Sequence, residues 1–264
     1  MNILDTIVAN KRKEVERNKA LFPVDKLEQR PLFARPVLSL CEFLADPERT
    51  GIIAEFKRKS PSKGLINGDA DVVEVTTAYA ASASGISVLT DKEFFGGTAA
   101  DLETARIQNV PILRKDFMID EYQVYEAKAM GADLVLLIAA CLNPEEVMML
   151  GTLAKGLGME VLLEIHDETE LGHICDMVDM VGVNNRNLKT FKVDINTSLD
   201  LIGKIPAGKP AIAESGISDI DTIVTLRRAG FSGFLIGENF MKQANPSIAF
   251  TDFVNQLKAK QNAN

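Results

Sequence analysis

Eight short apolar runs recur along the chain from residue 52 onward, and their regular spacing limits the fold more than any other feature. The runs are rich in β-branched residues and begin about 20 to 35 residues apart, as strands do when they alternate with other elements. They cover residues 52–56, 86–89, 110–113, 134–138, 160–165, 180–183, 210–213 and 233–236. Helical patterns lie between most of them, for example at residues 120–130, 144–157 and 219–229. This alternation predicts right-handed βαβ units and a parallel sheet.

Eight such units in about 200 residues favour a (β/α)8 TIM barrel, an α/β fold, over an open Rossmann sheet. No GxGxxG pattern follows the first run, which argues further against a dinucleotide site. Before that run, residues 3–20 and 38–44 have helical patterns. Because no low-complexity stretch or linker interrupts the chain, we expect one domain over residues 1–264, with a helical extension at 1–49 and the barrel at 50–264.

The net charge and the composition indicate which kinds of molecule the protein is expected to bind. The net charge of −8 argues against nucleic acid or an anionic membrane, so an anionic ligand would need a locally positive site. Three cysteines without CxxC spacing predict neither a disulfide framework nor a zinc cluster. With only His166 and His173 present, a multi-histidine metal site is not expected. We therefore expect a small-molecule ligand and no metal or cofactor.

The N-terminal segment MNILDTIVANKRKEVERNKA mixes acids with bases and lacks a long apolar core. It predicts a surface helix and not a signal peptide. No stretch approaches the roughly 20 apolar residues of a membrane span. We expect a cytoplasmic protein that acts as a monomer and does not bind membranes.

Polar side chains follow the ends of the predicted strands. After the first run, Glu55 and Lys57 are two residues apart and therefore share one face of the strand. Burying an acid and an ammonium is costly, so these two form either a structural ion pair or a pair used in chemistry. Later runs end in the same kind of residue, namely Lys115, Glu164, Asn184, Arg186, Glu214 and Ser215. Because the active site of such barrels lies at the carboxyl ends of the strands, we expect these groups to meet at one mouth.

This combination of groups suits proton transfer on an anionic substrate. A lysine that is desolvated or near another cation has a lowered pKa and acts as an acid near neutral pH. A glutamate in the same cleft has a raised pKa and acts as a base. One charged residue at a strand end is usually a cap or a salt bridge, but several strands that deliver polar groups to one rim indicate a reaction site.

Glycines at the last two strand ends predict a phosphate site. Gly216 and Gly237 expose backbone N–H groups next to predicted helix starts, and loops seven and eight commonly bind phosphate in these barrels. The backbone N–H of Glu238 adds a further donor, although its carboxylate is unfavourable there. The alternative is that the glycines only permit tight turns. An aromatic ligand would be walled by Phe95, Phe117 and Leu136. Core packing is the competing explanation for the leucine.

The chain contains, in this order, the blocks IIAEFKRKSPSKG, SVLTDKEFFGG, PILRKDF, GADLVLLIAA, LLEIHDE, VGVNNRNL, AESGI and GFLIGE. Together they resemble the blocks of the indole-3-glycerol-phosphate synthase family, and the helical extension also fits that family. The segments EFKRKSPS, LRKDF and NNRNL are specific in combination. The final glycine block alone is weak, because many phosphate-binding barrels share it.

The resemblance implies a carboxy-lyase of tryptophan biosynthesis. Its substrate would be 1-(2-carboxyphenylamino)-1-deoxyribulose 5-phosphate, a phosphorylated aromatic molecule that is closed to indole-3-glycerol phosphate with release of CO2 and water. Lys115 then corresponds to the general acid that protonates the substrate carbonyl, and Glu164 to the general base of the later dehydration. Lys57 corresponds to a residue that meets the substrate carboxylate and donates a proton in dehydration, and Arg186 to one that positions the substrate.

The same resemblance gives the other site residues supporting roles. The acid–base network would be supported by Glu55, Asn184, Glu214 and Ser215. The phosphate-binding positions would be Ser60, Gly216, Gly237 and Glu238. Some relatives carry a second fused barrel, for which this chain is too short, so a single activity is expected.

Two competing functions fit the chain less well. A neighbouring phosphate barrel, phosphoribosylanthranilate isomerase, is expected to have a cysteine at the end of the first strand, where this chain has Glu55, Phe56 and Lys57. A catalytically inactive barrel that serves as a scaffold is expected to lack at least one of Lys115, Glu164 and Glu55, and all three are present.

Overall fold

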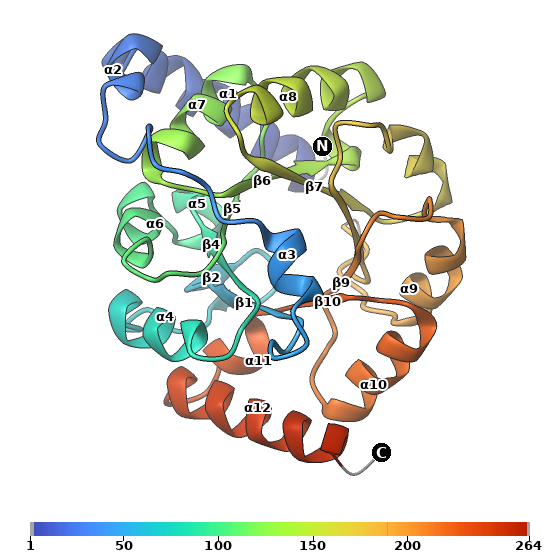
Figure 1. The fold of residues 1–264 in the computed structure, drawn as a ribbon. Coiled ribbons are helices and arrows are strands. Elements are labelled where there is room, and N and C mark those ends of the chain that lie inside the picture. Colours follow the sequence, from blue (N-terminus) through green and yellow to red (C-terminus); the bar gives the residue numbers. More distant parts are fainter. Residues whose placement is uncertain (1–2, 189, 263–264) are drawn as a thin grey trace.

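Eight parallel strands close into a barrel in the computed structural model, which describes residues 3–188 and 190–262 (Figure 1). The strands are β1 (Ile52–Phe56), β4 (Gly85–Leu89), β5 (Ile112–Lys115), β6 (Leu134–Ile138), β7 (Glu160–Ile165), β8 (Met180–Asn184), β9 (Ala211–Glu214) and β10 (Gly233–Ile236). Their order is β1-β10-β9-β8-β7-β6-β5-β4, and β4 pairs with β1 to close the ring. The predicted TIM barrel is confirmed. The outer limits predicted for the domain, residues 1 and 264, lie outside the described residues.

Helices surround the barrel, and their caps explain where they begin and end. They are α4 (Val72–Ala80), α5 (Lys92–Phe95), α6 (Ala99–Ala105), α7 (Glu121–Met130), α8 (Pro144–Gly156), α9 (Asn196–Leu201), α10 (Ile220–Ala229), α11 (Glu238–Met241) and α12 (Pro246–Asn262), with 3-10 turns η1 (Ala139–Cys141), η2 (Glu168–His173) and η3 (Ile202–Lys204). The Asp120 side chain accepts from the Tyr122 N–H at the start of α7, and Gly131 ends that helix with a φ of 88°. Asp219 and Gly230 bound α10 in the same way.

Side chains alternate between the inside and the outside of the barrel, and this alternation decides which residues reach the mouth. The apolar interior includes Ile53, Leu113, Leu162 and Ile212. Two positions further along the same strands stand Glu55, Lys115, Glu164 and Glu214. Since residues two apart share a face, these four charged side chains point inward at the carboxyl end of the barrel.

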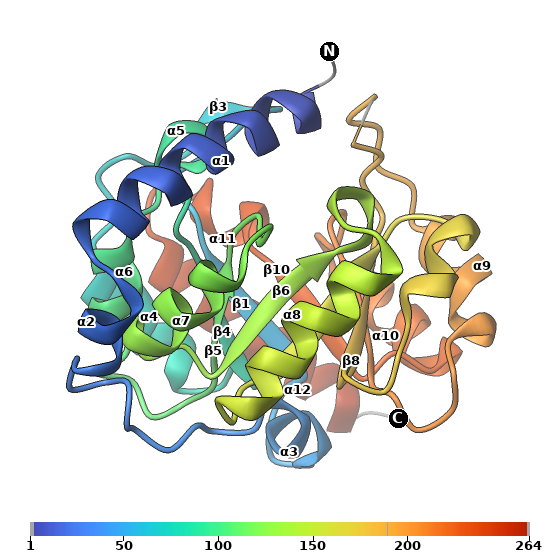
Figure 2. The same ribbon diagram turned by 90° about the horizontal axis from the view of Figure 1, so that it is seen from above.

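The N-terminal extension contacts both ends of the barrel. Helix α1 (Ile3–Leu21) lies along the end where the strands finish, and α3 (Leu40–Ala45) lies at the opposite end, with α2 (Val24–Glu28) between them in the chain (Figure 2). Lys11 of α1 is completely buried, with its Nζ 2.9 Å from a carboxylate oxygen of Asp91 and 2.9 Å from one of Asp116. These ion pairs fasten α1 to the loops that follow β4 and β5.

A short hairpin follows β1 at the same end of the barrel. It consists of β2 (Lys59–Ser60) and β3 (Gly64–Leu65), which pair antiparallel. Within the described ranges, no helix is both long enough and apolar enough to cross a membrane.

Candidate active site

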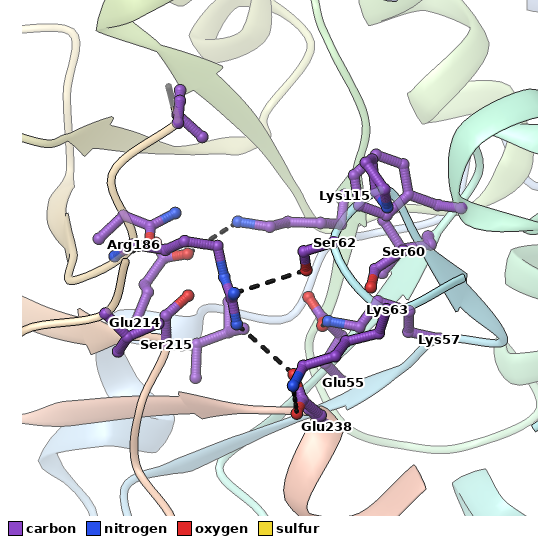
Figure 3. Close-up of a pocket in the computed structure, with 18 of the residues that line it drawn as sticks. Glu55, Lys57, Ser60, Ser62, Lys63, Lys115, Arg186, Glu214, Ser215 and Glu238 are labelled. Atoms are coloured by element: carbon purple, nitrogen blue, oxygen red, sulfur yellow. Dashed lines mark hydrogen bonds and ion pairs between the residues drawn. The ribbon is translucent and has the colours of Figure 1, made fainter. Parts of the chain in front are cut away.

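A cavity of about 510 Å³ opens at the carboxyl ends of the strands, and every residue predicted for the site lines it (Figure 3). The predicted acid–base residues are Glu55, Lys57, Lys115, Glu164, Asn184, Glu214 and Ser215. The predicted binding residues are Ser60, Phe95, Phe117, Leu136, Arg186, Gly216, Gly237 and Glu238. The structure therefore places the whole predicted set at one mouth, while the role of each residue remains a prediction.

Lys115 lies between two carboxylates at the base of this cavity. Its Nζ donates to Oε2 of Glu164 and to Oε2 of Glu214, each at 2.7 Å. The three residues come from β5, β7 and β9, and their inward direction follows from the alternation along each strand. One ammonium thus bridges two buried carboxylates, and a proton has a short path among the three groups.

The charges within this group shift its pKa values in different directions. Burial alone would lower the pKa of Lys115, but the carboxylates of Glu164 and Glu214 raise it above its ordinary value. The sequence-based expectation of a lowered lysine pKa is therefore wrong for Lys115, because its nearest neighbours are anions and not cations. Burial raises the pKa of Glu214 to about 7, as expected for a glutamate in the cleft. Burial also favours the neutral form of Glu164, yet Lys115 and His166 hold its pKa well below the ordinary value.

A second ammonium stands on the same inner face. Nζ of Lys57 donates to Oε1 of Glu55 at 2.5 Å, so the two residues do pair, as their spacing predicts. Asn184 orients the central carboxylate, since its Nδ2 donates to Oε1 of Glu164 at 3.1 Å. The backbone N–H of Arg186 in turn donates to Oδ1 of Asn184 at 3.0 Å, which fixes the amide.

At the same mouth, Arg186 reaches toward the hairpin and toward α11 (Figure 3). Its Nη1 lies 3.5 Å from Oγ of Ser62, and its Nη2 lies 3.5 Å from Oε2 of Glu238. Nζ of Lys63 lies 3.8 Å from the other oxygen of Glu238. The Glu238 carboxylate thus rests between two cations that an anionic ligand would also attract.

Glycines at this mouth leave space that neighbouring side chains occupy. A Cβ at Gly182 of β8 would lie 2.2 Å from Oε1 of Glu214, and one at Gly237 would lie 2.5 Å from Oε1 of Glu55. Gly237 caps α11 with a φ of −126°, which residues with a side chain also adopt. A glycine is therefore needed here to leave space for Glu55 and not to form a turn. Gly216 has a φ of 75° and needs glycine for its backbone as well. It does not adjoin a helix, because α10 begins only at Ile220.

Strain and an unpaired hydroxyl occur at the same mouth. Ser215 has a φ of 66°, which is unusual for a residue with a side chain, and its carbonyl accepts from Nδ2 of Asn185 at 3.1 Å. The buried hydroxyl of Ser60 has no hydrogen-bond partner among the described residues. Such groups in a lined cavity are typical of sites that bind a polar ligand.

The apolar part of the cavity is formed by aromatic side chains and the barrel interior. The rings of Phe95 and Phe117 are tilted by 40° with centroids 5.9 Å apart. Leu136 belongs to the interior apolar cluster and also lines the cavity, so both explanations offered by its sequence position apply. A flat aromatic ring would find apolar contacts here beside the charged groups.

Several lining residues were not predicted. Ser62 and Lys63 belong to the polar SPSKG turn, from which only Ser60 was predicted to be a site residue. Ile3, Leu4 and Ile7 of α1 complete the wall, and their spacing predicts a helix without indicating what it covers. His166 lies behind Glu164, and nothing in the sequence alone distinguishes it from a surface histidine.

Within the part of the chain that the structure describes, no group of three or more His, Cys, Asp or Glu side chains is arranged to hold a metal ion.

The chain is similar to known proteins over nearly its whole length. The family model for indole-3-glycerol phosphate synthase matches residues 4–253. An indole-3-glycerol phosphate synthase of Bacteroides thetaiotaomicron is 48% identical over 259 residues, which cover 97% of this chain and 99% of the relative. One from Polaromonas sp. is 42% identical over 254 residues, 94% of this chain and 96% of the relative. The resemblance read from the motifs is confirmed, and the chain belongs to the indole-3-glycerol phosphate synthase family.

Proposed function

We propose that this cavity carries out the reaction of its family, the closure of 1-(2-carboxyphenylamino)-1-deoxyribulose 5-phosphate to indole-3-glycerol phosphate. CO2 and water are released, and no redox step is involved. The observation that carries the proposal is the bridging position of Lys115, 2.7 Å from both Glu164 and Glu214, in a cavity that has apolar walls and further cations. The substrate combines an aromatic ring with a carboxylate and a phosphate, and the lining offers contacts for all three.

Ring closure needs a proton at the substrate carbonyl. As the aromatic carbon attacks, the carbonyl oxygen gains negative charge and becomes a stronger base than an amine. Lys115 can therefore protonate it even though the neighbouring carboxylates raise the pKa of this lysine. Burial raises the pKa of Glu214 to about 7, so Glu214 is the neighbour best suited to return a proton to the neutral amine.

Decarboxylation follows from the chemistry of the closed ring. The bond between the ring carbon and the substrate carboxylate breaks, its electron pair restores the aromatic ring, and CO2 leaves. Lys57 supplies the positive charge for this carboxylate before it is lost, and Glu55 holds that ammonium on the inner face through the 2.5 Å contact.

Dehydration then forms the indole double bond. Glu164 takes a proton from the ring carbon next to the one that bears the hydroxyl, and the electrons of that C–H bond form the double bond. The hydroxyl made in the first step leaves as water with a proton from Lys57. Glu164 is suited to this step because its pKa is held low and Asn184 fixes its orientation. The hydrogen bond from Nδ2 of Asn185 to the carbonyl of Ser215 fixes the end of β9 next to Glu214.

The substrate phosphate would bind at the side of the cavity formed by the last two loops and the hairpin. Ser60 offers an unpaired hydroxyl, and Arg186 and Lys63 offer positive charge. Backbone N–H groups of the glycine loops at Gly216 and Gly237 add donors without steric hindrance.

We also propose that the extension and barrel act as one domain in a monomeric, cytoplasmic enzyme. The ion pairs of Lys11 join α1 to the barrel, which supports a single unit. The predicted site is complete within one copy of the chain, so no residue of a second copy is needed to build it. The biosynthetic role of the family supports the location.

The direct test is fluorescence-monitored indole formation from the carboxyphenylamino-deoxyribulose phosphate with purified protein and EDTA. Turnover with EDTA present is expected, and it would also exclude a requirement for a free metal ion. Binding without turnover would favour a scaffold protein. Neither binding nor turnover would refute the proposed substrate.

A further inference from the structure

His166 is the first residue after β7 and lies directly behind Glu164, outside the lining of the cavity. Its side chain is only 10% exposed. Nε2 of the ring is 3.1 Å from Oε1 of Glu164, and Nδ1 is 3.3 Å from Oε2 of Glu170 in η2. The same Glu170 oxygen accepts the backbone N–H of His166 at 2.6 Å, which fixes the position of this second carboxylate.

This arrangement favours a positively charged ring. Each ring nitrogen lies close to a carboxylate oxygen, 3.1 Å from Glu164 and 3.3 Å from Glu170, and nearby negative charge stabilises the imidazolium. Burial opposes the charged form, but the contacts with Glu164 and Glu170 raise the pKa of His166 to about 10. A pKa raised on folding means that the interaction is fully present below the ordinary histidine value and is lost only as the pH rises through about 10.

From η1, Cys141 approaches Glu164 and Glu170, but burial raises the pKa of this thiol to about 12, so it stays neutral. From β8, Asn184 contributes an uncharged amide to Glu164. His166 therefore lies beside Oε1 of Glu164, while Lys115 contacts Oε2 of the same carboxylate.

We propose that His166, clamped by Glu170, is a positioning residue that keeps Glu164 ionised through both halves of the reaction. This inference depends on the proposed function. Once Lys115 has given its proton to the substrate, it no longer stabilises the Glu164 anion, and burial alone would make that carboxyl take up a proton. The imidazolium keeps its charge throughout. The 3.1 Å contact is an ion pair without hydrogen-bond alignment, so its effect acts through charge and therefore on the pH profile.

The chain offers a matched pair of variants, since His166 and His173 are its only histidines. His166→Asn keeps an N–H donor but removes the positive charge. His173→Asn is the control, because the His173 ring contacts the backbone carbonyls of Glu170 and Leu142 and not the site. A merely structural effect on η2 would appear in both variants, whereas loss of the charge is specific to His166→Asn.

Single-turnover experiments should follow CO2 release and indole fluorescence together. In His166→Asn, indole formation should slow by about tenfold to a hundredfold while CO2 release changes little, and KM should stay near the wild-type value. The acidic limb of the indole-forming step should move upward by about one to three pH units. Glu170→Gln should move it in the same direction by less. An unshifted limb, or equal slowing of both steps, would overturn the proposal.

A spectroscopic measurement separates this inference from the proposed function. The imidazole of His166 should titrate well above the ordinary histidine pKa in the wild-type protein, and Glu164→Gln should lower that pKa by at least about one unit in NMR. An ordinary pKa for His166 would refute the clamp. Absence of wild-type turnover with an intact NMR shift would instead refute the reaction and leave the pair in place.

Discussion

Buried charges gather at both ends of the barrel, and the two groups differ in how completely their carboxylate oxygens are paired. At the end where the strands begin, Asp133 is fully buried just before β6. Its Oδ1 accepts from Arg35 and from the Leu38 N–H, and its Oδ2 accepts from Arg106 and from the Ile112 N–H. Each carboxylate oxygen therefore has two donors.

The mouth is built from similar residues but leaves polar atoms unpaired beside open space. Among the described residues, Oε1 of Glu214 and the hydroxyl of Ser60 have no hydrogen-bond partner, and both residues line the cavity. Buried polar groups are nearly always paired in folded proteins, so the exceptions require an explanation. The comparison teaches that buried ion pairs alone do not identify a functional site, whereas unpaired polar atoms around a cavity do.

The largest effect is expected from removing the ammonium that bridges the mouth. Lys115→Ala should reduce kcat by about 10³–10⁴-fold, because no other group supplies its proton, while substrate affinity stays nearly unchanged. Steady-state fluorescence assays would measure both parameters, with the thermal transition as a check of folding. A loss of about tenfold or less would refute its role as the main acid.

Removing the buried charge of Asp133, at the end where the strands begin, should affect stability and not the chemical reaction. Asp133→Asn removes the charge that compensates Arg106 and Arg35, and should lower the free energy of unfolding by about 3–5 kcal/mol. Urea denaturation measures this, and kcat per folded molecule should remain at the wild-type level. Glu168→Gln is the control, since its ion pair with Lys204 is exposed and worth less than about 1 kcal/mol. A drop in kcat for Asp133→Asn would contradict the conclusion that only the mouth of the barrel takes part in catalysis.

Glu164→Gln tests whether the paired carboxylate at the mouth is the base of the second half-reaction. The amide keeps the size of the side chain but cannot accept a proton, so indole formation should slow by about 10²–10³-fold. CO2 release should persist, since ring closure depends on Lys115. Kinetics unchanged at every pH would count against this role.

The smallest effect concerns the carboxylate that occupies the cationic side of the mouth. Glu238→Gln should release Arg186 and Lys63 for the substrate anion and lower KM by about twofold to fivefold, as expected for a partly exposed ion pair. Substrate titration at low and high salt would measure this, and the gain should shrink at high salt. A raised KM would mean that the Glu238 side chain itself binds the substrate.

Much of this mouth could be predicted because side chains alternate between the two faces of a strand, so the position of a residue in the strand determines the side to which it points. Once the run ending in Lys115 is recognised as a barrel strand, alternation places its ammonium inward, and the same holds for Glu164 and Glu214. The eight strand positions follow from local composition, because each run is apolar and bounded by turn residues.

The remainder depends on distances that local patterns do not contain. The raised pKa of Lys115 arises from two carboxylates that lie 49 and 99 residues away in the chain, and only the closed barrel brings them within 2.7 Å. In the sequence, Gly182 looks like an ordinary strand residue. Only the folded structure shows that its missing side chain leaves space for Glu214. The imidazole of His166 is likewise defined by its neighbours and not by its sequence context.

The buried ammonium of Lys11 has a consequence for the order in which the enzyme is made. Helix α1 leaves the ribosome before β4 and β5, yet Lys11 is neutralised by Asp91 and Asp116, which follow those strands. A buried lysine without these partners would be unstable, so α1 cannot take its final position until the chain has extended past β5. The wall formed by Ile3, Leu4 and Ile7 is therefore completed only after the strand that bears Lys115 exists.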